Sequence, residues 1–140
     1  NRERSWYLSL GYLSGKMRES APEQLWAADL SYQMNYPNET ADTVSLMLAS
    51  ERLWGMHVDR SHYCCMGDWA EAYWGYGIGS FWKTNDSISS FADLQSYHLR
   101  GHFGFENLLN LDRRLRAEFV LRLSPAGLSG EILMGYTLAP

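Results

Sequence analysis

The sequence lacks most of the features that place a small protein in a class. It has no run of 18 uncharged apolar residues, so no stretch has the composition of a transmembrane helix. Its net charge of −4 argues against a nucleic-acid partner, which normally requires a basic patch. The two cysteines, Cys64 and Cys65, are adjacent, a spacing that strains a mutual disulfide and matches no metal motif. We therefore expect loop cysteines without a chemical role, no metal and no cofactor.

The chain is also short, and it starts without an apolar targeting core. A length of 140 residues suits one domain, residues 1–140, and leaves no room for a second core. Because the other features below indicate export, we expect a mature chain whose signal peptide has been cleaved.

Aromatic residues and alternating hydrophobicity are what the sequence does have. Aromatic residues make up 14% of the chain, with 6 Trp and 9 Tyr, the two types that favour membrane–water interfaces. In residues 26–36 (WAADLSYQMNY) the even positions are apolar or aromatic and most odd positions are polar. A strand sends successive side chains to opposite faces, and eleven tilted residues cross about 25 to 30 Å. This stretch predicts a membrane-spanning strand.

Six further segments alternate in the same way, at residues 5–14, 43–53, 69–82, 95–107, 114–124 and 131–138. Because bacterial single-chain barrels use even strand numbers, we expect an eighth strand within residues 53–65. The alternative for that region is a loop, with the missing strand lying in an N-terminal part absent from this chain.

One face of these strands collects ionisable residues, and the other is almost entirely apolar. Buried charges are tolerated when they are paired, so we expect a lumen network and a lipid-facing exterior. The predicted fold is therefore all-β: an antiparallel transmembrane β-barrel of about eight strands with a polar, ion-paired interior. A β-sandwich or a soluble barrel covered by a partner is the alternative. The predicted lumen network comprises Asp29, Glu71, His98, Arg100, His102, Glu106, Arg114, Arg116, Glu118 and Arg122.

The network is expected to act as a plug and not as a pore, because side chains fill a barrel of eight strands. His98 and His102 are four residues apart on one strand, about 13 Å, which is too far to chelate one metal ion by themselves.

Three stretches of the second half carry a family resemblance. Residues 132–138 (I-x-M-x-Y-x-L) look like the closing signal of bacterial outer-membrane barrels. Residues 75–79 (GYGIG) and 123–128 (LSPAGL), with Glu131, resemble the outer-membrane lipid A 3-O-deacylases, eight-stranded barrels that cleave an acyl ester of lipopolysaccharide. The resemblance implies a nucleophile at Ser124 and an orienting carboxylate at Glu131. The catalytic His position falls on Arg122, which cannot accept a proton from serine.

The sequence thus predicts a small bacterial outer-membrane barrel that is non-catalytic, with a structural or surface-interaction role. Its expected contacts are membrane lipid, lipopolysaccharide, and a protein partner at a loop spanning residues 58–68. The rival hypotheses are a lipid A or phospholipid acyl-ester hydrolase using Ser124, and a subunit of a larger envelope complex.

Overall fold

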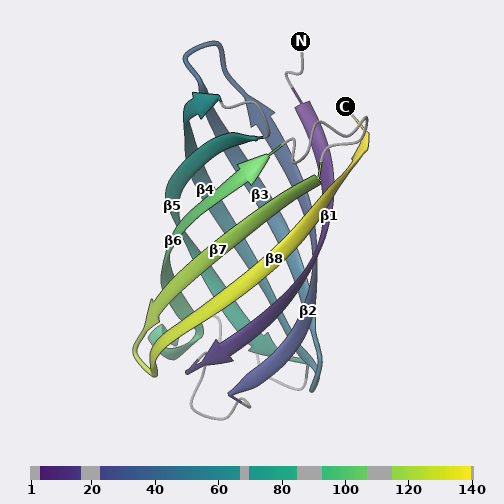
Figure 1. Ribbon diagram of the computed structural model, residues 1–140. Coiled ribbons are helices and arrows are strands. Elements are labelled where there is room, and N and C mark those ends of the chain that lie inside the picture. The colour runs from purple at the N-terminus through teal and green to yellow at the C-terminus, as the bar shows by residue number, and fades with distance from the viewer. Residues whose placement is uncertain (1–3, 17–22, 67–69, 85–92, 107–114, 140) are drawn as a thin grey trace.

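Eight antiparallel strands close into a barrel in which each strand pairs with its neighbours in chain order, and β8 pairs with β1 (Figure 1). The structure is a computed structural model, and it describes residues 4–16, 23–66, 70–84, 93–106 and 115–139. The strands are β1 (Arg4–Gly15), β2 (Gln24–Asn35), β3 (Thr40–Ala49), β4 (Leu53–Met66), β5 (Glu71–Lys83), β6 (Tyr97–Glu106), β7 (Leu115–Ser124) and β8 (Gly127–Ala139), with a 3-10 helix, η2 (Leu94–Ser96), before β6. The predicted antiparallel eight-stranded barrel is confirmed.

Within the described ranges, no helix is long and apolar enough to cross a membrane.

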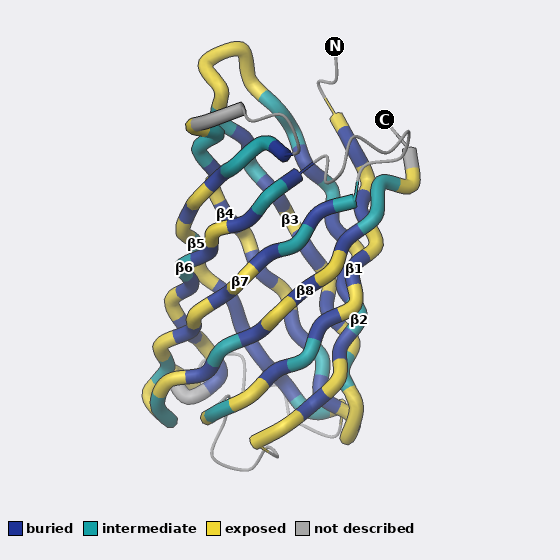
Figure 2. Tube along the Cα trace, in the orientation of Figure 1, coloured by how far each residue is buried: buried dark blue, intermediate teal, exposed yellow. Residues whose placement is uncertain are grey.

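Burial alternates along most of each strand, as Figure 2 shows, and the exception is the end of β5, where residues 79–82 are all buried. In β1, Leu8 and Leu10 point outward while Tyr7 and Ser9 are buried inside. In β6 and β7, Phe103 and Phe119 lie on the outer wall and stack on each other with ring centroids 5.1 Å apart. The apolar face of the alternating pattern is therefore the exterior of the barrel, and the polar face is its lumen.

The register of the strands sets the tilt of the barrel. The residue partners that start at Ser5 on β1 lead once around the wall through Asp59 and Arg122 and return to β1 at Gly15, ten residues further along. A stagger of this size in eight strands tilts them by about 40° from the axis. Ten- to fourteen-residue strands at that tilt are about 25 to 35 Å tall, which matches the apolar thickness of a bilayer.

The eighth strand is β4, and it covers the region in which the even strand number of bacterial barrels predicted it. The prediction of a loop at residues 58–68 is wrong, because residues 58–66 belong to this strand and residues 67–69 fall outside the described part. The cysteines are likewise not in a loop: both belong to β4 next to a register shift between Tyr63 and Cys65, and Cys64 is disulfide-bonded. The outward Arg60 and His62 hide the strand pattern in the sequence, since they put polar side chains on the apolar face.

The two ends of the barrel differ. Both chain termini lie at one end, together with the short β2–β3 connection (Figure 1). Strands β1, β3, β5 and β7 finish at the other end, which carries two tight turns, β3–β4 and β7–β8. One of these, between β3 and β4, places Glu51 and Arg52 at φ of 61° and 59°. Paired positive φ values are typical of a two-residue hairpin turn.

Candidate functional site

Near the end that carries the termini, the lumen is closed by a network around Arg116. The guanidinium donates to Gln33 Oε1 at 3.0 Å and to Glu118 Oε1 at 3.0 Å. Its carbon lies 4.4 Å from the centre of the Tyr7 ring and 5.2 Å from that of Tyr73. These contacts hold the charge between two aromatic faces and a carboxylate, which is the kind of pairing that a buried guanidinium requires.

The network around Arg116 forms the upper layer of the lumen, and two carboxylates of this layer also accept hydrogen bonds from tyrosine hydroxyls. Glu106 Oε1 accepts from Tyr7 at 3.1 Å and from Tyr63 at 2.8 Å, and Glu118 Oε1 accepts from Tyr73 at 2.7 Å. A tyrosine in the lumen therefore does two things: its ring fills the barrel and its hydroxyl satisfies a buried charge.

The middle layer centres on His57. Its Nδ1 lies 2.8 Å from Asp59 Oδ2 and its Nε2 lies 3.2 Å from Asp29 Oδ2. Asp59 also accepts from Arg100 Nε at 3.0 Å. The His57 ring thus lies between two aspartates, Asp29 on β2 and Asp59 on its own strand.

The lower layer consists of an ion pair and an apolar cap. Arg122 Nη2 donates to Glu131 Oε1, and the guanidinium lies 5.3 Å from the centre of the Phe81 ring. Both side chains are buried in the lumen. Below them, apolar side chains pack across the end of the barrel away from the termini. The cluster comprises Leu13, Leu25, Ala27, Met47, Leu53 and Phe81.

Glycines on β5 make room for this lumen network. A Cβ added to Gly75 would lie 2.5 Å from His102 Nε2, and one added to Gly79 would lie 2.5 Å from His98 Nε2. Distances below 3.0 Å do not occur for real Cβ atoms. Backbone oxygens also approach this run, since a Cβ at Gly75 would lie 2.0 Å from the Arg60 carbonyl and one at Gly77 would lie 2.1 Å from the Val58 carbonyl. Close packing therefore explains the glycine run that contributed to the deacylase resemblance.

The cavity in the middle of the lumen is small. A cavity of about 20 Å³ lies between the upper and middle layers, beside His57, Glu118 and Leu133. A volume of that size holds about one water molecule. Ser61 and His102 line the same cavity and are hydrogen-bonded at 2.8 Å, but both are buried, and among the described residues no group is hydrogen-bonded to His102 Nδ1 to orient the ring for catalysis.

The candidate esterase residues are not arranged for hydrolysis. Ser124 ends β7, and its hydroxyl donates to the carbonyl of Gly127 at 3.3 Å while accepting from the N–H of Ala126 at 3.2 Å. These contacts make it a turn residue. Glu131 is buried and contacts Arg122 rather than a histidine. No histidine among the described residues is hydrogen-bonded to the Ser124 hydroxyl.

The other residues of the predicted network are placed as follows. His98 is buried, with its ring stacked on Phe81 at 4.9 Å. Glu71 opens β5 and is half-buried. Arg114 lies outside the described residues. The lumen network also contains His57 and Asp59, which were not among the predicted residues, and their alternation with Met56 and Val58 is the sequence signal for them.

The described residues hold no group of three or more metal-ligating side chains. The lumen carboxylates instead lie against arginines and His57.

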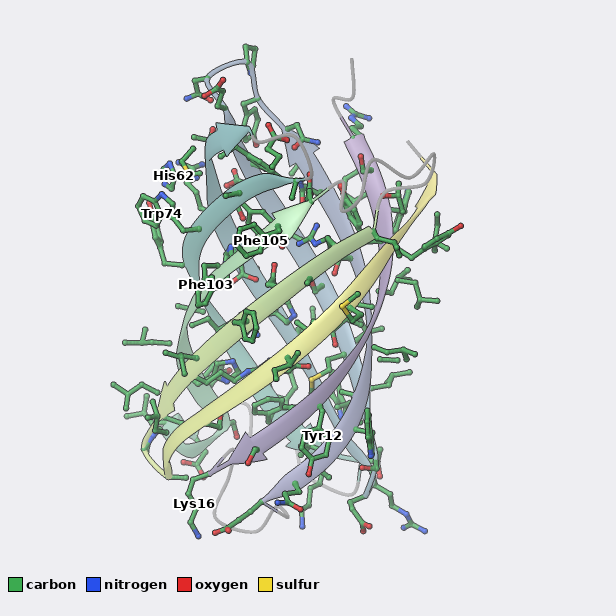
Figure 3. The ribbon with its side chains drawn as sticks, viewed as in Figure 1. Tyr12, Lys16, His62, Trp74, Phe103 and Phe105 are labelled. Atoms are coloured by element: carbon green, nitrogen blue, oxygen red, sulfur yellow. The ribbon has the colours of Figure 1, made fainter. Side chains whose placement is uncertain are left out.

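The outer wall carries aromatic residues at both ends of an aliphatic band. Trp6 contacts Tyr32 near the end with the termini, with ring centroids 4.8 Å apart, and Tyr12 contacts Trp26 near the other end at 4.9 Å (Figure 3 labels Tyr12). Leu8 and Leu10 lie between these pairs on β1. Two aromatic girdles around an aliphatic band are the exterior of a membrane barrel.

Polar groups interrupt this wall near the end with the termini. Arg60 donates through Nε and Nη2 to the two carboxylate oxygens of Asp42, at 2.8 and 2.9 Å. Beside them the ring of His62 stacks on Trp74 at 4.7 Å, on the outside of the barrel (Figure 3). Both groups face outward and take no part in the lumen network.

The sequence matches no family model and no curated protein. Solved structures with the same fold exist. The outer-membrane protein Ail of Yersinia pestis, in a phospholipid bilayer nanodisc, is similar with a TM-score of 0.55 and 14% identity, over 97% of this chain and 100% of that chain. Ail in complex with the heparin analogue sucrose octasulfate is similar with a TM-score of 0.56 and 11% identity, over 96% of this chain and 95% of that chain. At these identities the likeness shows the fold alone, and neither comparison shows a lipid A deacylase.

Proposed function

We propose that this chain is a small outer-membrane β-barrel of a Gram-negative bacterium, with a sealed lumen, that acts by contacts at the cell surface and not by catalysis. The observation that carries the proposal is the sorting of side chains in the closed barrel. Apolar side chains cover the outside, and all five buried carboxylates of the described residues face the lumen with three arginines and His57. Only hydrocarbon outside and ion pairs inside satisfy both faces.

The end away from the termini is proposed to face the outside of the cell. Bacterial barrels have short periplasmic turns and longer extracellular loops, and residues 84–96 form the longest connection, at that end. The solved structure of Ail with a heparin analogue shows that a barrel of this fold can bind a ligand from solution. Lipopolysaccharide, which forms the outer leaflet, would contact the aromatic girdle nearest this end. Delivery through a cleaved export signal is part of the same proposal.

The two lysines of the chain, Lys16 and Lys83, provide a test of this orientation, because both lie at the end away from the termini. A membrane-impermeant amine reagent is expected to label both residues in intact cells, as detected by mass spectrometry of the purified protein. Labelling of the lysines only in permeabilised cells would show the opposite orientation. Absence of the folded protein from the outer-membrane fraction would refute the localisation.

An ion pair adds an internal control to this experiment. Lys16 Nζ lies 2.7 Å from Glu23 Oε1, and the hydrogen bond to this carboxylate raises the pKa of Lys16 above its ordinary value. A raised pKa leaves less of the reactive neutral amine at a given pH. Glu23→Gln is therefore expected to speed the labelling of Lys16 while the labelling of Lys83 stays the same.

A sealed lumen also predicts that the barrel does not conduct ions. The purified barrel in a planar lipid bilayer is expected to show no conductance steps. The ion pairs and the apolar cap fill the described lumen, and the cavity beside His57 measures only about 20 Å³. Stepwise, ion-selective currents would refute the structural role of the lumen network.

A further inference from the structure

The ion pair between Asp42 and Arg60 is unusual because of where it lies. The Arg60 side chain is 51% exposed and that of Asp42 is 25% exposed, on a wall that is otherwise apolar or aromatic. Tyr36 fixes the pair from the side, since its hydroxyl donates to Asp42 Oδ2 at 3.0 Å. An arginine held by two parallel bonds to a carboxylate is pre-organised, so little side-chain freedom remains to be lost when a ligand binds.

Strand register places the pair at the level of the aromatic girdle. Arg60 lies between Asp42 on β3 and Tyr76 on β5. On β4, the next outward-facing residue toward the middle of the wall is Val58. The next one toward the rim is His62, which stacks on Trp74. Aromatic girdles lie at the depth of lipid headgroups. The charges therefore lie at the headgroup level and not in the hydrocarbon.

The pair retains hydrogen-bonding capacity toward the membrane. A guanidinium has five N–H donors, and Asp42 takes two of those of Arg60, which leaves three. Asp42 Oδ1 accepts one bond from Arg60, whereas Oδ2 already accepts two. A ligand that combines a phosphate with an ammonium group fits both partners. A simple anion would gain less, because the neighbouring carboxylate repels it.

An open groove beside Arg60 provides space for such a ligand. It has a volume of about 420 Å³ and lies against the β2–β3 connection. Within that connection, Thr40 Oγ1 donates to Asn38 Oδ1 at 2.6 Å, which fixes one edge of the groove. The groove is lined by Tyr36, Pro37, Asn38, Thr40 and Arg60.

We propose that Tyr36, Asp42, Arg60 and this groove bind the phosphoethanolamine headgroup of a glycerophospholipid, in the leaflet at the end of the barrel that carries the termini. The phosphate accepts hydrogen bonds from Arg60, and the ammonium group donates to Asp42. The acyl chains of the lipid follow the apolar wall toward Val44 and Val58, which lie directly below the pair on β3 and β4. This inference rests on the proposed function, since it requires the wall to lie in a bilayer.

The test is native mass spectrometry of the full chain released from nanodiscs that contain equal amounts of phosphatidylethanolamine, phosphatidylglycerol and phosphatidylcholine. The wild type is expected to retain phosphatidylethanolamine roughly tenfold more than either other lipid, the scale of one charge-assisted contact. Arg60→Gln and Asp42→Asn are each expected to abolish the preference. Arg52→Gln, at the opposite end of the barrel, removes an arginine as a matched control and is expected to keep it.

The other possible results of this experiment each contradict the proposed headgroup site. Equal retention of the three lipids by an inserted wild type, or an unchanged preference in Arg60→Gln, overturns the inference and leaves the membrane assignment standing. A preference for phosphatidylglycerol that grows in Asp42→Asn shows a simple anion site and also overturns it. If Arg60→Gln does not fold, Tyr36→Phe tests the same site, and an undiminished preference there refutes it. A wild type that does not enter the nanodisc at all refutes the proposed function as well.

Discussion

Replacing Arg122 with leucine tests the lumen network most directly. Arg122 is only 1% exposed, and its guanidinium contacts Glu131 and the ring of Phe81. Arg122→Leu leaves a carboxylate buried in the barrel without its cation. Because leucine is also shorter than arginine, the substitution does not restore the lost volume.

The expected cost follows from these contacts. Breaking a buried ion pair by removing one partner costs about 3 to 5 kcal/mol, mostly through the charge left behind. The contact over Phe81 adds about 0.5 to 1 kcal/mol. The introduced leucine side chain would regain part of this by packing on the apolar cap, so we expect a net loss of about 4 kcal/mol. Removing both charges, in Arg122→Leu with Glu131→Leu, leaves no unpaired ion and is expected to cost about 1 kcal/mol or less.

The measurement is equilibrium unfolding by urea in lipid vesicles, followed by tryptophan fluorescence and by the gel mobility of the folded barrel. The single and double variants with Glu131→Leu complete a double-mutant cycle, in which the double variant is expected to lose less stability than either single variant. A loss below about 1 kcal/mol in Arg122→Leu, or a double variant that loses the sum of the singles, would contradict a buried pair at this position.

Three further outcomes are expected. Leu10→Arg, at a position 64% exposed in the middle of the wall, should lower the free energy of unfolding in vesicles by about 2 to 4 kcal/mol. Leu94→Arg in η2 should lower it by about 0 to 1 kcal/mol. Equal losses would show that the bilayer does not surround Leu10. Exchanging Glu51 and Arg52 for Asn and Gly should stabilise the barrel by about 1 kcal/mol in the same assay, since both residues have positive φ. Incubation with lipopolysaccharide should leave lipid A fully acylated by mass analysis, and an acyl loss that disappears in Ser124→Ala would establish a hydrolase.

The alternation of side chains was predictable from the sequence because it is a local property of an extended backbone. Leu30, Phe103 and Phe119 were assigned to the exterior, and Arg100 and Glu118 to the interior, and the structure places them there. The even-strand rule then located β4 even though its outward Arg60 and His62 obscured the pattern.

The pairing of those side chains was decided only by the tertiary structure. His57 meets Asp29 across 28 residues, and Arg116 meets Gln33 across 83. Both contacts depend on the ten-residue stagger of the closed wall, which all eight strand registers set together and no single segment encodes. For the same reason Arg60, which taken alone is a charge on an apolar face, becomes half of an outer-wall ion pair only when β3 places Asp42 opposite it.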